Sequence, residues 1–255
     1  MAFRKRNLIY GIIAAVLHST LLGNAQSQTE DAETISVIFS TLKVGSGSFE
    51  GIRYFESQDK VSSPLDFRLV QRSGPYEYRG PREITFFETI PAPSAADPEA
   101  VVNKPLARTS IPRGLTNVLL FFEKLSRKDQ NDGESLPYRI HIMDDSMAGF
   151  PENSVVVFNA CGPKLVGSVG KERRRFEYGP ANPIDYGRVK TGSFSTAFAV
   201  ETSDGPKLVF ENRLELSKGY RVILMLAPPR RQGSIRIEVY SIPQPVDSQP
   251  PITAN

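Results

Sequence analysis

The chain has 255 residues, 40% of them hydrophobic, and carries 31 Lys and Arg residues against 28 Asp and Glu residues. Its single cysteine, Cys161, excludes an intramolecular disulfide, and a chain of this length buries enough apolar surface to fold without one. The basic excess lies in residues 4–6, and without them the two signs are equal in number, so the charge gives no indication of nucleic-acid binding.

The first 25 residues have the three parts of a secretory signal peptide. Residues 4–6 are basic, residues 8–17 are apolar, and Gly23 and Ala25 are the small residues that a signal peptidase requires. The apolar segment is about half of the roughly 20 residues that a transmembrane helix needs. We therefore expect cleavage after Ala25, a periplasmic or extracellular location, and no stable membrane span after cleavage.

From residue 34 onward, apolar residues recur with a period of two in many short runs, and no long stretch holds a helical period with caps. The pattern predicts an all-β fold of about 13 strands separated by turn signals such as Asn131-Asp132-Gly133. The expected strands are 35–43, 49–55, 65–71, 83–88, 117–124, 138–143, 154–159, 164–169, 172–178, 193–200, 207–216, 220–226 and 234–242.

One immunoglobulin-like sandwich uses about 100 residues, so we expect two antiparallel β-sandwich domains in tandem, with one large jelly-roll sandwich as the alternative. Asp, Ser, Gly and Pro accumulate at residues 144–151, which predicts domains at 34–145 and 148–243. The proline-containing tail, 244–255, is expected to be disordered. Residues 91–113 hold five prolines and are expected to form a long loop, either a binding loop or a solvated insertion with an edge strand near 106–111.

If the chain is an enzyme, the candidate residues are His141, Asp144 and Asp145. Adjacent carboxylates can raise one another's pKa or bind Ca²⁺, although such a pair also suits a polar turn between strands. His141 is the only histidine after residue 25, which excludes a copper site that needs two imidazoles. A looser set of His141, Met143, Met147 and Cys161 would suit Cu(I). We expect no metal and no cofactor, and Cys161 to be a buried apolar side chain.

The candidate anion-binding residues are Lys171, Arg173 and Arg175. In a strand, Arg173 and Arg175 face one side while the intervening arginine faces the other. They would bind an anionic polymer of the cell envelope, or they would protect a sheet edge from pairing.

Two aromatic residues, Tyr76 and Tyr78, lie in a segment rich in Gly and Pro, which we interpret as a turn. There they are candidates for stacking on a sugar ring. Packing against the end of a sandwich is the alternative.

Residues 144–159, which read DDSMAGFPENSVVVFN, and the strand-like residues 233–240 resemble runs in exported bacterial β-sandwich proteins of unassigned function. This resemblance implies export and architecture, and it supplies no catalytic residues. The length and the strand number are also similar to those of periplasmic pilus chaperones, although the basic cleft and proline-rich strand of that family are not found here. Membership of that family would imply an exposed edge that pairs with a client strand.

These patterns together favour a non-catalytic binding or scaffolding protein of the periplasm or cell envelope, with an envelope protein or polysaccharide as partner. The alternatives are a hydrolase or metal-dependent enzyme centred on His141, Asp144 and Asp145, and a chaperone-like periplasmic protein.

Overall fold

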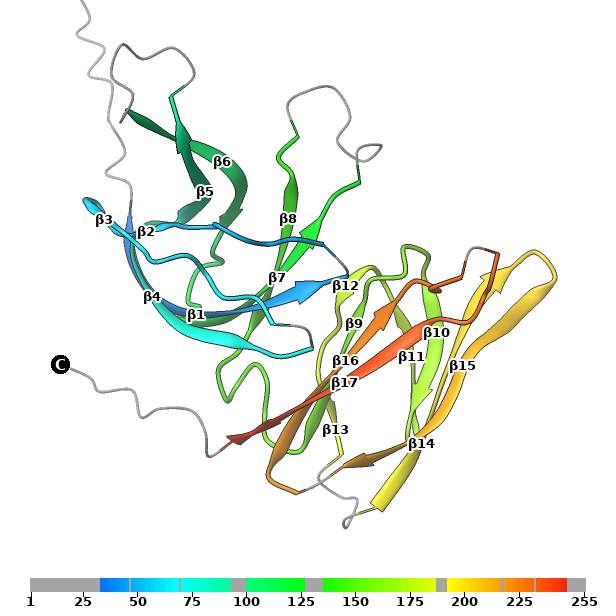
Figure 1. The fold of residues 1–255 in the computed structure, drawn as a ribbon. Coiled ribbons are helices and arrows are strands. Elements are labelled where there is room, and N and C mark those ends of the chain that lie inside the picture. Colours follow the sequence, from blue (N-terminus) through cyan, green and yellow to red (C-terminus); the bar gives the residue numbers. More distant parts are fainter. Residues whose placement is uncertain are drawn as a thin grey trace, which may run out of the picture. The chain divides into compact units, whose positions relative to one another are not determined.

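The computed structural model describes residues 33–45, 47–68, 70–92, 100–126, 135–186, 192–216, 218–231 and 233–246. The expected signal peptide, residues 1–25, and most of the expected disordered tail, residues 247–255, lie outside the described residues. The described residues contain many strands and no α-helix, which confirms the predicted all-β class (Figure 1). From Glu33 onward they belong to one compact unit.

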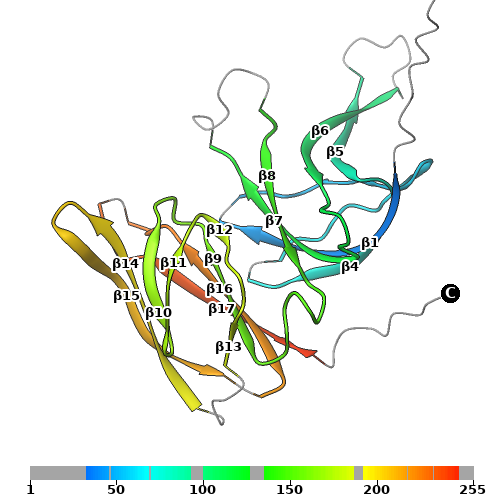
Figure 2. The same cartoon turned by 180° about the vertical axis from the view of Figure 1, so that it is seen from behind.

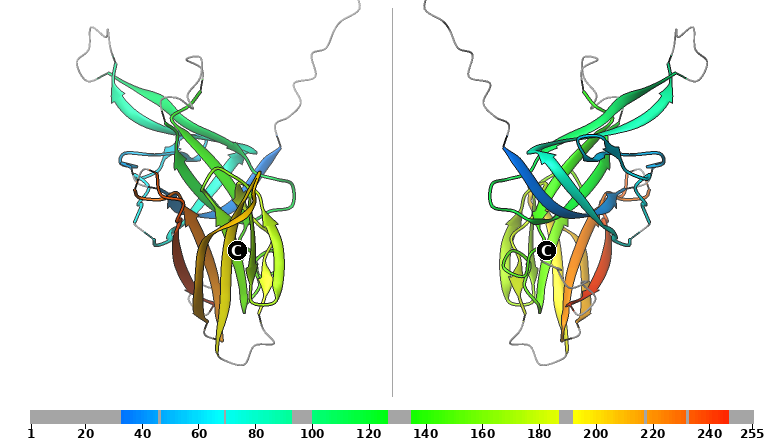
Figure 3. Two further views of the ribbon diagram at one scale, coloured as in Figure 1. Left: turned by 90° about the vertical axis from the view of Figure 1, so that its right-hand side faces the viewer. Right: turned by 90° about the vertical axis from the view of Figure 1, so that its left-hand side faces the viewer.

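The strands up to residue 144 form one four-stranded sheet and two hairpins. They are β1 (Thr34–Val44), β2 (Phe55–Ser57), β3 (Lys60–Val61), β4 (Ser73–Pro81), β5 (Glu83–Pro91), β6 (Val101–Ser110), β7 (Asn117–Lys124) and β8 (Tyr138–Asp144). The sheet has the order β4-β1-β7-β8, with β1 antiparallel to β4 and parallel to β7. β2 pairs with β3, and β5 pairs with β6 as a long hairpin that both views of Figure 3 show.

The strands after residue 150 form two sheets. They are β9 (Ser154–Asn159), β10 (Leu165–Val169), β11 (Glu172–Phe176), β12 (Gly179–Pro180), β13 (Ile184–Asp185), β14 (Gly192–Thr202), β15 (Gly205–Leu216), β16 (Tyr220–Ala227) and β17 (Glu238–Pro245). One sheet has the order β12-β9-β16-β17, with β13 also pairing with β9, and the other has the order β11-β10-β14-β15. Figure 2 shows β14 and β15 as a long hairpin in yellow.

One pattern of strand directions occurs twice. In the sheet β4-β1-β7-β8 the two central strands are parallel and each outer strand is antiparallel to its neighbour. The prediction of purely antiparallel sheets is therefore wrong at the central pair, where the long connection between β1 and β7 allows parallel pairing. The sheet β12-β9-β16-β17 has the same directions at every pairing. In both sheets the first strand of the segment pairs with a strand more than 60 residues further along the chain.

Three apolar clusters fill the interior. One draws its residues from 35–142 and a second from 155–239. A third joins the two sheets just described, and in it Phe121 of β7 stacks on Phe158 of β9 at 4.3 Å between ring centroids. β7, β9 and β16 therefore bury both of their faces, which explains why their sequences are continuous apolar runs rather than alternating ones.

Several predicted boundaries are wrong. Residues 65–71 form no strand, and residues 49–55 contribute only the start of β2. Residues 73–80, interpreted as a turn, form β4, which has glycine-proline pairs at both ends and pairs with β1 along most of its length. Local turn signals mislead here because pairing with a distant strand outweighs them.

Some prolines of the expected loop and tail lie in strands. Residues 101–110 of the expected loop 91–113 form β6, and Pro105 lies where a β-bulge interrupts the pairing with β5, so no inter-strand hydrogen bond is lost with its N–H. Residues 243–245 belong to β17. The N–H of Val246 donates to Gly219 on the β16 side, so the ring nitrogens of Pro243 and Pro245 face away from β16.

Candidate functional site

The sheet β11-β10-β14-β15 carries on one face the arginines that the sequence singles out. Strand alternation places the side chains of Arg173 and Arg175 on the face opposite the apolar cluster. Arg174 points the other way, and its guanidinium donates to the carbonyl oxygens of Asn182 at 3.3 Å and Pro183 at 3.5 Å. β11 thus presents two arginines together and holds the third in a structural contact.

A depression of about 530 Å³ lies beside the two arginines. Its floor consists of half-buried side chains on β10 and β14 that lie in register with Arg173 and Arg175, namely Val166, Ser168, Ala197 and Ala199. Leu208 of β15, 55% exposed, lines the far side. The depression therefore has a cationic edge, a floor of small side chains and an apolar far edge.

The charge at the cationic edge is available to a ligand. Arg175 makes an ion pair with Glu201 at 3.1 Å, but both side chains are well exposed, and such surface pairs contribute little free energy. No hydrogen bond or ion pair joins the Arg173 side chain to any described residue. Lys171 lies in the turn before β11 and does not line the depression, so the structure groups two of the three predicted anion-binding residues.

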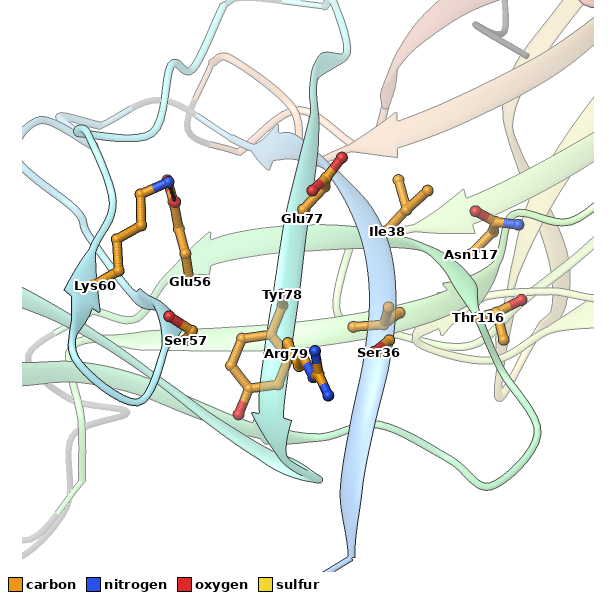
Figure 4. A pocket seen from close by; sticks show the side chains of 11 residues that line it. Ser36, Ile38, Glu56, Ser57, Lys60, Glu77, Tyr78, Arg79, Thr116 and Asn117 are labelled. Carbon is orange, nitrogen blue, oxygen red and sulfur yellow. Dashed lines mark ion pairs between the residues drawn. The ribbon is translucent and has the colours of Figure 1, made fainter. Parts of the chain in front are cut away.

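A second depression, of about 460 Å³, lies where β1 and β4 meet the β2–β3 hairpin (Figure 4). Its hydrogen-bonding side chains are Ser36, Ser57, Thr116 and Asn117. Glu77 and Arg79 of β4 add one charge of each sign, and Glu56 and Lys60 of the hairpin form an ion pair with each other. This lining suits a polar ligand without a strong net charge.

The two candidate stacking tyrosines lie on β4 and serve packing. Tyr78 is 6% exposed, and its hydroxyl donates to the carbonyl oxygen of Pro81 at 2.6 Å. Tyr76 is half-buried, packs on Phe39 at 5.4 Å between ring centroids, and its hydroxyl oxygen accepts from the backbone N–H of Asp66. Both rings are therefore engaged in packing, and neither is free to stack on a sugar.

His141 of β8 belongs to a small polar cluster. Its Nε2 lies 3.1 Å from a carboxylate oxygen of Glu123, whose other oxygen accepts from the Tyr178 hydroxyl. Burial alone would raise the pKa of Glu123, but the hydrogen bonds from His141 and Tyr178 and the charge of Arg139 together lower this pKa below its ordinary value. The carboxylate is thus held ionised, and the ring of His141 packs edge-on against Phe158.

Asp145 is 2% exposed and forms ion pairs with two guanidinium groups. Arg72, which precedes β4, reaches both carboxylate oxygens, and Nη2 of Arg221 on β16 lies 3.3 Å from Oδ1. Arg221 is itself 1% exposed and stacks over the Phe150 ring at 4.7 Å. Because both carboxylate oxygens are engaged, Asp145 is a structural counter-ion rather than a proton acceptor.

Asp144 closes the turn that follows β8. Its Oδ1 accepts from the backbone N–H of Ser146 at 2.9 Å. Its carboxylate also lies where a Cβ on Gly149 would be, at 2.1 Å, so this position requires glycine. No hydrogen bond or ion pair joins any two of His141, Asp144 and Asp145, and each has its own structural partners.

Among the described residues, no three His, Cys, Asp or Glu side chains gather as metal ligands would. Cys161 is partly buried, against the expectation of a fully buried side chain. Burial raises the pKa of its thiol to about 12, so at neutral pH the side chain is a thiol and not a thiolate. The described part of the chain also has no helix that is long and apolar enough to span a bilayer.

No protein-family model matches this chain, and no curated protein matches it. The chemistry of its own side chains is therefore the basis for a functional assignment.

Sequence patterns missed Arg72 and Arg221, the partners of Asp145. Arg221 has one signal in the sequence, because it is the only charged residue in the apolar run of β16. Arg72 has no comparable signal in the sequence, because it is separated from Asp145 by 73 positions of the chain.

We predict that Asp145→Asn destabilises the fold by about 3–5 kcal/mol, because the substitution leaves two arginines, one of them fully buried, without their counter-ion. Urea unfolding followed by circular dichroism measures the change. Asp204→Asn, at an exposed turn residue, is the matched control and is expected to change stability by less than about 0.5 kcal/mol. Equal effects of the two substitutions would contradict the structural role of Asp145.

Proposed function

We propose that the chain is an exported binding protein of the periplasm or cell envelope, and that the arginine-edged depression binds an anionic envelope polymer. One observation carries the proposal: Arg173 and Arg175 lie together at the edge of a 530 Å³ depression. Among the described residues, Arg173 has no hydrogen-bond or ion-pair partner, and Arg175 has one exposed ion pair, with Glu201. Guanidinium groups bind carboxylate and phosphate groups through paired hydrogen bonds.

The spacing of the arginines favours a polymer. Two residues of a strand span about 7 Å, so Arg173 and Arg175 present cationic groups at about this interval. An extended chain with successive anionic groups engages both arginines at once, and its uncharged part lies over Ala197, Ala199 and Leu208. Once one anionic group of the polymer is bound to one arginine, the next group is held close to the other arginine, so the polymer binds more tightly than a single anionic group.

We infer that the fold is two immunoglobulin-like sandwiches in tandem. The support for two similar units in tandem is the pattern of strand directions, which occurs once in the sheet β4-β1-β7-β8 and again in β12-β9-β16-β17. Two apolar clusters also draw on separate segments of the chain, one before residue 143 and one after residue 154. The second sandwich carries the arginine-edged depression.

A binding role also agrees with the positions of the candidate catalytic residues. Asp145 neutralises two arginines, Asp144 closes a turn, and His141 bonds Glu123. Each of these three side chains is therefore engaged in a contact that stabilises the fold. Arg173 at the depression, by contrast, is exposed and makes no such contact with a described residue.

We predict that the double substitution Arg173→Glu and Arg175→Glu weakens binding to polygalacturonate at least about tenfold, because two charge-assisted contacts become repulsive. Fluorescence anisotropy with a labelled oligomer at low ionic strength measures the affinity. Binding by the unaltered protein is expected to weaken as salt rises.

Arg108→Glu is the matched control, since Arg108 is an exposed arginine of β6 outside the depression. Neutral dextran is the ligand control and is expected not to bind. An equal loss with Arg108→Glu, or equal binding of dextran, would show that the depression is not the binding site.

The export proposal predicts a mature chain that begins at Gln26. Expression of the full chain in a Gram-negative host, followed by N-terminal sequencing of the periplasmic fraction, tests this. Ala25→Arg is expected to block cleavage, because a signal peptidase requires a small residue at that position. A cytoplasmic, uncut wild-type chain would refute export.

A further inference from the structure

The cluster around Asp145 contains a buried excess of positive charge. Arg221 is 1% exposed and Gln244 is 7% exposed, and the side chain of Arg72 is 24% exposed. Two guanidinium groups face a single carboxylate, that of Asp145. Burial lowers the pKa of Arg221, the charge of Asp145 opposes this effect, and the charge of Arg72 lowers the pKa further. The cluster therefore keeps one positive charge that no described acidic side chain neutralises.

Two donors in this cluster have no acceptor in the part of the chain that the structure describes. Nη1 of Arg221 donates to the carbonyl oxygens of Asp145 and Phe150, and Nη2 pairs with the Asp145 carboxylate. The third nitrogen of this guanidinium, Nε, has no hydrogen-bond partner among the described residues. The amide nitrogen Nε2 of Gln244 is likewise buried and unpartnered. A buried donor without an acceptor destabilises the folded state, because it has lost its hydrogen bond to water.

The orientation of the Gln244 amide is determined by its neighbour. Its Oε1 accepts from Nη1 of Arg72 at 2.9 Å. Exchanging the amide oxygen and nitrogen would point an N–H group at a guanidinium, which is a donor only. Nε2 therefore faces away from Arg72 and still requires an acceptor.

The two unpartnered donors come from adjacent positions. Arg221 of β16 and Gln244 of β17 lie directly opposite each other in the antiparallel pair, which places their Cβ atoms about 5 Å apart on one face of the sheet. Both side chains also contact the same network through Asp145 and Arg72. One acceptor between them can satisfy both.

We propose that Nε of Arg221 and Nε2 of Gln244 bind a buried monatomic anion of the halide class. A halide accepts hydrogen bonds without donating any and neutralises the remaining positive charge. A water molecule would also accept from both donors, and the Asp145 carboxylate and Oε1 of Gln244 keep lone pairs for its hydrogens, but a neutral water would leave the remaining positive charge without a counter-ion. The site is separate from the arginine-edged depression and does not depend on the proposed function.

Crystals of the protein grown in sodium bromide test the site directly by anomalous diffraction. A bromide peak is expected about 3.3 Å from both donor nitrogens, the contact distance of a halide with an N–H group. A water molecule in that place, without anomalous signal, would overturn the proposal.

Thermal unfolding tests the same site in solution. Replacing sodium gluconate by sodium chloride at constant ionic strength is expected to raise the Tm by at least about 2 °C and to saturate, because the anion binds only the folded state. Gln244→Glu is expected to abolish this rise, since its carboxylate replaces the unpartnered nitrogen with an oxygen and supplies the negative charge. Gln58→Glu, the same charge change at an exposed position, is expected to preserve the rise. No rise in the unaltered protein, or equal rises in all three proteins, would overturn the proposal.

Discussion

The pairing of Asp145 with Arg72 and Arg221 is the interaction on which the rest of the structure depends. It joins segments that are far apart in the chain, since Asp145 follows β8, Arg72 precedes β4 and Arg221 lies on β16. Around it the third apolar cluster packs the sheet β4-β1-β7-β8 against the sheet β12-β9-β16-β17, with Phe121 on Phe158. A buried ion pair adds little stability by itself, but it penalises any other arrangement of these sheets, because the charges would then be buried without partners.

The arginine-edged depression, the proposed binding surface, is separate from the contact between the two sheets. The arginine-edged depression lies on the sheet β11-β10-β14-β15, whose opposite face packs Leu165, Phe176 and Phe198 into the second apolar cluster. A strand held by core packing on one face presents the side chains of its other face at defined positions. Arg173 and Arg175 can therefore hold a fixed spacing toward a ligand while the charge cluster at Asp145 stays buried.

The features that the sequence predicts are those that depend on neighbouring residues. Apolar runs located β7, β9 and β16, and strand alternation placed Arg173 and Arg175 together. The features that it missed depend on distant pairing. β4 was interpreted as a turn because of its glycines and prolines, although it pairs with β1. The depression beside the arginines forms only because the small side chains of Ala197 and Ala199 lie in register with β10. Asp145 was a catalytic candidate because its partner Arg221 is 76 positions away, and no residue near Asp145 in the sequence indicates this contact.

Native-state hydrogen exchange of β7 and β16 tests most directly whether the third cluster and the Asp145 ion pairs make the described strands one cooperative unit. Mass spectrometry of peptides from the two strands gives the free energy of opening of each. We predict that the two values agree within about 1 kcal/mol, because neither strand can open without breaking the shared contacts. Opening of one strand at a free energy several kcal/mol below that of the other would contradict the account.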